Sequence, residues 1–181
     1  MKTRLLRGLF VVLTCVASDA QDRFQVFGGY SLIGHSVTNR YSGPTTLFKF
    51  NGWDASFTAK VAPHVALEAD FPGGVTSYFQ TPSKTFAYMA GPRLFLNRDK
   101  ATIYGHVLVG GMTFSAPIGG VASTSFALAV GGGGDYWFNR HLGVQLIEAD
   151  YLHNNNTVLG PSHADFRIST GVVFRFGRGG H

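Results

Sequence analysis

The sequence predicts an all-β fold: an eight-stranded antiparallel up-and-down transmembrane β-barrel preceded by a cleavable signal peptide. Three observations lead to this prediction. Apolar residues alternate with polar ones along eight segments, short and long connections follow each other in turn, and no stretch after the N-terminal signal is as long and apolar as a membrane helix. Alternation with a period of two is typical of β-strands. A barrel exposes only alternate residues to lipid, so it can cross a membrane with a moderately polar sequence.

Residues 1–20 form a predicted secretory signal peptide. Its positive residues are Lys2, Arg4 and Arg7. An apolar core follows at 8–16, and the small residues at 17–20 predict cleavage before Gln21. This core is too short to cross the roughly 30 Å of a bilayer interior as an anchoring helix. A lipoprotein signal is an alternative because Cys15 lies near the core, but Thr14 occupies a position where a smaller residue is usual.

Residues 21–181 are long enough for one barrel domain. Cleavage would remove Cys15, the single cysteine of the chain, so the barrel should contain no internal disulfide. The formal net charge of the whole chain is +5, and the basic residues after the signal are scattered. We therefore expect no nucleic-acid partner. The sequence implies no cofactor.

The eight predicted strands are 24–32, 52–61, 65–71, 85–96, 102–114, 125–138, 142–151 and 165–176. In the second of these, apolar residues occupy the odd positions from Trp53 to Val61, whereas the even positions include Asp54 and Lys60. A helix would scatter such residues around its surface. Each strand is therefore expected to have one apolar face.

Two of these strands carry specific expectations. Pro92 should interrupt the hydrogen-bond ladder of 85–96, because proline has no N–H to donate. Strand 102–114 is apolar on both faces, and we expect Ile103, Val107 and Val109 to point outward. His106 would then point into the barrel.

Strand 142–151 predicts a β-bulge. Leu142 and Leu146 have the same parity as Glu148 and Asp150, although the two pairs differ in polarity. One extra residue near Leu146 would switch the faces and resolve this conflict.

The connections predict which end of the barrel is external. Residues 62–64, 97–100 and 139–141 are short polar turns. The four expected long loops are 33–51, 72–84, 115–124 and 153–163. Short turns at the periplasmic end and longer loops outside are typical of outer-membrane barrels.

The apolar face is expected to meet lipid. It carries Trp53, Phe57, Phe71, Phe86, Phe126, Tyr136, Phe166, Phe174 and Phe176. An eight-stranded barrel has an interior just wide enough for side chains to fill, so these rings would overfill it. Inner positions on several strands are instead Gly, Ala, Ser or Thr. A soluble barrel with the apolar face inside is the alternative.

The opposite face predicts a charge network in the lumen. Its members are Asp54, Glu68, Asp70, Arg93, Asp135, Asp150, Arg167 and Arg175. Arginine can make paired hydrogen bonds to carboxylates, and paired charges are tolerated where isolated ones are costly. The network could plug the lumen or line a selective ion path. Long arginine side chains in so narrow a barrel favour the plug.

The sequence carries five family-like motifs: Trp53–Ser56, Gly91–Arg93, Gly131–Tyr136, Gln145–Tyr151 and Arg167–Phe176. Through them, residues 21–181 resemble the small eight-stranded outer-membrane β-barrel proteins, the group of the OmpA transmembrane domain and OmpX, often called porin-family proteins. The resemblance implies a terminal-strand aromatic that the barrel-assembly machinery reads, which would be Phe176. The sequence departs from this pattern because residues 177–181 follow.

Enzyme and metal motifs are weak. Residues 151–155 faintly resemble a segment of outer-membrane lipid A deacylases, but Asn155 occupies the serine position and His153 has no nucleophile beside it. The glycine run 131–134 is not expected to be a phosphate-binding loop, because no Lys-Ser or Lys-Thr follows it and it lies inside a predicted strand. We expect these glycines to let a large neighbouring side chain, or a bent strand, fit the inner wall. The histidines show no metal-site spacing. We predict no catalytic, cofactor or metal residues.

The sequence thus predicts a non-enzymatic outer-membrane barrel with a charge-plugged lumen. Its partners would be outer-membrane lipids, the barrel-assembly machinery, and an external ligand or protein that contacts the four loops. A narrow pore or small-solute channel is the first alternative. A lipid A-modifying enzyme is the second.

Overall fold

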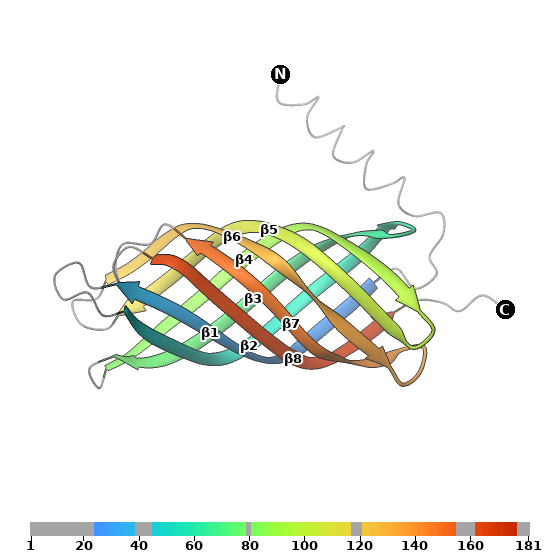
Figure 1. Ribbon diagram of the computed structural model, residues 1–181, viewed down its shortest axis with the longest axis horizontal. Helices are drawn as coiled ribbons and strands as arrows, with labels where there is room; N and C mark the ends of the chain where they lie inside the picture. The colour runs from blue at the N-terminus through green and yellow to red at the C-terminus, as the bar shows by residue number, and fades with distance from the viewer. Residues whose placement is uncertain (1–23, 39–44, 79–80, 117–120, 155–161, 177–181) are drawn as a thin grey trace, which may run out of the picture.

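The computed structural model describes residues 24–38, 45–78, 81–116, 121–154 and 162–176, and these form eight β-strands (Figure 1). The strands are β1 (Phe24–Thr38), β2 (Thr45–Ala62), β3 (Val65–Tyr78), β4 (Thr81–Arg98), β5 (Ala101–Ala116), β6 (Val121–Trp137), β7 (Leu142–Asn154) and β8 (Ser162–Phe176). The predicted signal peptide (1–20) lies outside the described residues, as does the tail at 177–181.

The strands close into a single antiparallel barrel in which each strand pairs with the next along the chain. β1 and β8 complete the cylinder, with a register from Phe24 opposite Phe176 to Val37 opposite Ser162. This up-and-down topology confirms the predicted fold class. Within the described residues, no helix is long and apolar enough to cross a membrane.

The alternation of the sequence determines which face each side chain takes. In β5, Ile103, Val107 and Val109 are exposed on the outside, whereas His106 is buried in the lumen. The same alternation holds along most of the other strands, so the bulky apolar residues form the outer wall. The predicted facing is therefore confirmed, and this outer wall is the surface that a bilayer would cover.

Two predicted irregularities occur. Leu146 and Ile147 are both exposed, and the pairing of β7 with β8 shifts between Gln145 and Glu148. This is the predicted β-bulge, and it brings Glu148 into the lumen. In β4 the strand continues through Pro92, but its register with β5 skips Gly91 and Pro92, as expected where an N–H is missing.

The four long connections are shorter in the structure than the sequence predicts. β1 continues to Thr38 and β2 begins at Thr45, and the other three connections are shortened in the same way, which leaves 39–44, 79–80, 117–120 and 155–161 between the strands. A membrane strand needs about 9–11 residues to cross the bilayer, whereas these strands have 13 to 18. Beyond the bilayer the outer face no longer meets lipid, so strand pairing can continue without the apolar alternation that lipid requires.

The three short turns lie where they were predicted. They connect β2 to β3, β4 to β5 and β6 to β7, at the end of the barrel where β1 begins and β8 ends. Asp99, in the middle turn, has a φ of 44°, a value that Asn and Asp tolerate better than most residues. In the last turn, Asn139 accepts hydrogen bonds from the backbone N–H groups of His141 and Leu142, both at 2.8 Å.

The lumen is filled in layers along the barrel axis. The half nearest the longer connections holds an apolar cluster of Ile33, Phe50, Ala87, Met89, Leu108, Met112, Phe114, Ala127, Ala129 and Leu152. Two small apolar clusters lie toward the turn end, Phe27–Trp137–Val173 and Ala66–Phe95–Tyr104. The charged side chains lie between these layers. Several inner residues are therefore larger than the small ones expected from the sequence.

Candidate functional site

The charged cluster is centred on Arg167 of β8, whose side chain is completely buried. Its Nη1 lies 3.4 Å from Asp54 of β2 and also contacts Asp70 of β3. Its Nη2 donates to Glu148 of β7 at 3.0 Å, and its Nε donates to Asp150 of the same strand at 2.8 Å. One guanidinium therefore joins four strands across the lumen.

Arg93 of β4 forms a second centre nearer the turn end. Its Nη1 donates to Glu68 at 3.0 Å and approaches the Thr58 hydroxyl at 3.5 Å, and its Nη2 donates to Asp135 at 3.4 Å. The guanidinium carbon lies 3.3 Å from the centre of the Tyr104 ring. Such stacking suits the planar arginine group.

His106 connects the two centres. Its Nδ1 lies 2.8 Å from Glu68, the partner of Arg93, and its Nε2 lies 2.9 Å from Asp150, the partner of Arg167. Carboxylates only accept hydrogen bonds, so this arrangement fits a ring that donates from both nitrogens. The result is a continuous chain of charged contacts across the interior.

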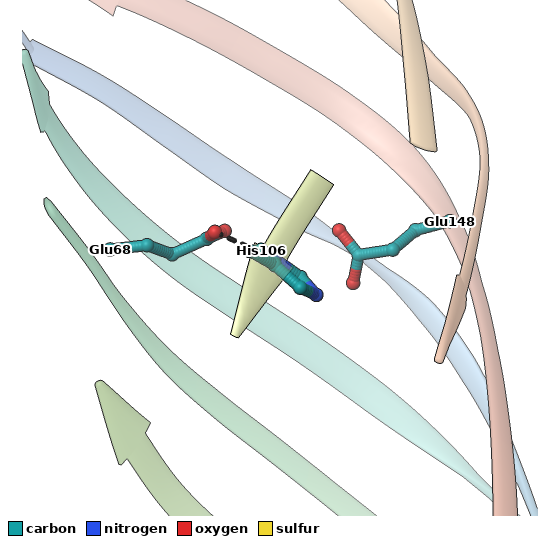
Figure 2. A group of neighbouring side chains, drawn as sticks. All are labelled: Glu68, His106 and Glu148. Atoms are coloured by element: carbon teal, nitrogen blue, oxygen red, sulfur yellow. Dashed lines mark hydrogen bonds and ion pairs between the residues drawn. The ribbon is translucent and has the colours of Figure 1, made fainter. Parts of the chain in front are cut away.

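Glu68, His106 and Glu148 also form a geometric candidate for a metal site, since one ligand atom from each lies within 4.8 Å of the others (Figure 2). Hydrogen-bond partners within the protein already occupy these atoms. Both nitrogens of His106 face carboxylates, and Glu148 accepts from Tyr104 at 2.6 Å as well as from Arg167. A cation would have to displace these bonds, so the residues do not fit a resident metal.

Glycines of β6 make room for this cluster. A side chain at Gly131 would collide with the carboxylate of Asp150, and one at Gly133 would meet the ring of Tyr104. Both positions face inward. The structural interpretation of the glycine run therefore agrees with the contacts, because large polar groups of neighbouring strands occupy the space.

The structure thus brings together seven of the eight predicted lumen residues, namely Asp54, Glu68, Asp70, Arg93, Asp135, Asp150 and Arg167. Arg175 lies farther toward the turn end, where its guanidinium stacks 3.7 Å from the Trp137 ring centre. Sequence reasoning omitted Glu148, His106 and Tyr104. The expected bulge and the inward facing of His106 were the available signals for the first two.

A separate polar group lies near the other end of the lumen. His35 Nδ1 is 2.8 Å from the Asp165 carboxylate, which also accepts from the Asn154 amide at 2.6 Å. The sequence placed His35 in a long loop, but it is a buried residue of β1. His153 is exposed on β7, and Asn155 lies outside the described residues.

Phe176, the predicted assembly signal, is the last residue of β8. Its side chain faces outward and is 55% exposed, and its register partner is Phe24. It therefore lies on the outer wall at the turn end of the barrel.

Comparison with solved structures finds small β-barrels. Neisserial surface protein A aligns with a TM-score of 0.67 at 16% identity, over 84% of this chain and 97% of that chain. Ail, the attachment invasion locus protein of Yersinia pestis, gives 0.56 at 16% identity, over 86% and 99%. The N-terminal β-barrel domain of Pseudomonas aeruginosa OprF gives 0.52 at 11% identity, over 87% and 100%.

The sequence itself matches no protein-family model and no curated protein. At identities this low, the structural likeness establishes the fold alone. The shared architecture and the apolar outer wall agree with the predicted location in a bacterial outer membrane. The chain folds as a transmembrane β-barrel of the small, eight-stranded outer-membrane type.

Proposed function

We propose that this chain is a non-enzymatic outer-membrane barrel whose lumen is plugged by charge and whose longer connections contact the environment. The observation that carries the proposal is the chain of contacts Arg93–Glu68–His106–Asp150–Arg167. With Asp54 and Asp135, this network draws on every strand except β1. Side chains held from opposite walls leave little space for a permeating solute.

The apolar cluster supports a closed lumen independently of the charges. Phe50, Met112, Phe114 and their neighbours pack between the charged layer and the end with the longer connections. A hydrophobic constriction excludes ions because they would lose their hydration there. A pore would need both layers to open.

The longer connections are the proposed contact surface. They fall within the predicted loops 33–51, 72–84, 115–124 and 153–163, at the end that faces outward in barrels of this fold. Two structural neighbours are named as a surface protein and an attachment invasion locus protein. Lipopolysaccharide or another protein is the proposed external partner, and outer-membrane lipids cover the wall.

Planar bilayer recording tests the plug. The folded chain should insert without producing discrete current steps, whereas the alternative of a narrow pore predicts a reproducible single-channel conductance. Insertion must be verified on the same sample, for example by protease protection of the barrel. Reproducible current steps from the inserted wild-type protein would contradict the plug.

Lipid A mass before and after expression tests the absence of enzymatic activity. We expect identical spectra for the wild-type chain, for a His153→Ala variant and for an empty vector. A mass change that the His153→Ala variant abolishes would identify a lipid A-modifying enzyme instead.

A further inference from the structure

We propose that the turn end of the lumen contains a binding pocket for a small free oxyanion of the phosphate type. The pocket lies between Arg93, at the edge of the charged cluster, and the mouth of the barrel where β1 begins and β8 ends. In barrels of this fold, that mouth faces the periplasm.

The pocket is a cavity of about 120 Å³ in the lumen. A cavity needs roughly 10–15 Å³ to hold one water molecule, so this one has room for several waters. An oxyanion with several heavy atoms can therefore enter with part of its hydration shell. A second cavity at the mouth shares Asn97, Thr102 and Arg175 with the first and connects it to the turns.

The charge of the lining is entirely positive. Lys60, Arg93 and Arg175 line the pocket together with uncharged residues, and no carboxylate is among the lining side chains. Among the described residues, Lys60 forms no ion pair; its ammonium lies 5.7 Å from the centre of the Phe95 ring. Arg93 is already paired with Glu68 and Asp135, so its charge is partly compensated, whereas Lys60 faces no carboxylate among the lining side chains; a bound anion would be attracted to this basic lining.

A neutral hydrogen-bond donor completes the pocket. The Thr102 hydroxyl donates to the Asn97 oxygen at 2.7 Å and accepts from the Trp137 indole N–H at 3.0 Å. This arrangement leaves the Asn97 amide group available as a donor. Arg175 is held against Trp137 by stacking at 3.7 Å, so its guanidinium is oriented before any ligand binds.

The position of the pocket selects a free anion rather than a lipid headgroup. Its lining side chains occupy the inward-facing positions of their strands, so the barrel wall separates them from lipid. Beyond Arg93 lie Glu68 and Asp135, and behind them the remaining acids of the cluster. An anion that enters from the periplasmic side would be attracted by the lining cations and repelled by the acids beyond them. It would therefore bind in the pocket and not pass farther along the lumen.

A titration with inorganic phosphate tests the proposal. The sequence contains two tryptophans, and Trp53 faces lipid, so a Trp53→Phe background leaves Trp137 as the reporter beneath Arg175. The folded chain in an uncharged detergent is titrated with phosphate at constant ionic strength maintained by sodium chloride. Calorimetry on the same samples detects binding that the fluorescence does not report.

We expect saturable binding of phosphate that chloride does not reproduce. Loss of one charged contact should weaken it about tenfold in Lys60→Gln, with recovery in Lys60→Arg. Lys84→Gln is the matched control because Lys84 is exposed on the outside of β4, and it should bind like the wild type. The proposal is overturned if neither method detects saturable binding, if chloride acts equally, or if Lys60→Gln retains wild-type affinity.

Discussion

Replacing Arg167 with methionine should destabilise the barrel more than any comparable change on its surface. Methionine retains an unbranched apolar stem but removes the guanidinium with its charge and donors. Asp54, Asp70, Glu148 and Asp150 would then face one another in the lumen without the cation that joins them. Unpaired buried carboxylates are the source of the expected cost.

The magnitude follows from the number of contacts that are lost. Removing one partner of a buried ion pair typically costs about 3–5 kcal/mol, and Arg167 is fully buried with four carboxylate partners. The contacts are not additive, so we expect a loss of about 4 kcal/mol in the free energy of unfolding. In the double variant Arg167→Met/Asp70→Asn, the loss should be about 1–2 kcal/mol smaller than the sum of the two single losses, because one orphaned charge is removed.

Urea unfolding in lipid vesicles, followed by tryptophan fluorescence, measures these differences. Arg98→Met is the matched control, since Arg98 is exposed at the turn end of β4, and it should change the free energy of unfolding by less than about 0.5 kcal/mol. A change below about 1 kcal/mol in Arg167→Met, or strict additivity in the double variant, would refute the view that this network stabilises the barrel.

Three further predictions concern assembly, orientation and register. Phe176→Ala should lower the yield of heat-modifiable barrel in the outer membrane much more than Phe166→Ala, although both rings face lipid on β8; equal yields would argue against an assembly signal. An epitope inserted within 155–161 should be labelled by antibody on intact cells, and one in the turn at 99–100 should be labelled only after permeabilisation; the reverse pattern would invert the orientation. Deleting Ile147 should remove the bulge and still yield folded barrel on a gel, whereas deleting Ala149 should prevent folding by turning Asp150 toward lipid. Equal tolerance of both deletions would contradict the register.

The facing of residues could be predicted because the bilayer selects it. In the middle of each strand, a charged residue on the lipid face costs about 2–4 kcal/mol, so charged residues there face the lumen. Near the longer connections this selection ends. Residues such as Ile33 and Phe50 were assigned to loops, yet they lie in paired strands and fill the lumen.

The partners within the lumen could not be predicted in the same way. Arg167 and Asp70 are 97 residues apart, and their contact depends on the stagger between strands, which a single sequence does not contain. The sequence indicated that these side chains share an interior, and chemistry indicated that opposite charges would pair. The sequence did not indicate that Arg175 would stack on Trp137 instead of joining the acids around Arg167.

The inner apolar layer did leave a signal in the sequence. The strand that became β5 is apolar on both faces, which a strand between lipid and a polar lumen does not need. Leu108, Met112 and Phe114 show the reason, because they point inward and pack with residues of other strands. A two-sided apolar strand in a small barrel therefore indicates a dry layer inside, just as a one-sided strand indicates a polar lumen.

The order of the layers restricts what the lumen can do. From the turn end inward, a basic pocket is followed by the paired acids and bases and then by the apolar cluster. A path that conducts a solute would need binding groups on both sides of a gate that can open. Here two barriers of different chemistry lie in series, and the proposed basic pocket lies on the turn side of both. A lumen of this kind is suited to a rigid support for the outer contact surface, with any small-molecule binding confined to its inner mouth.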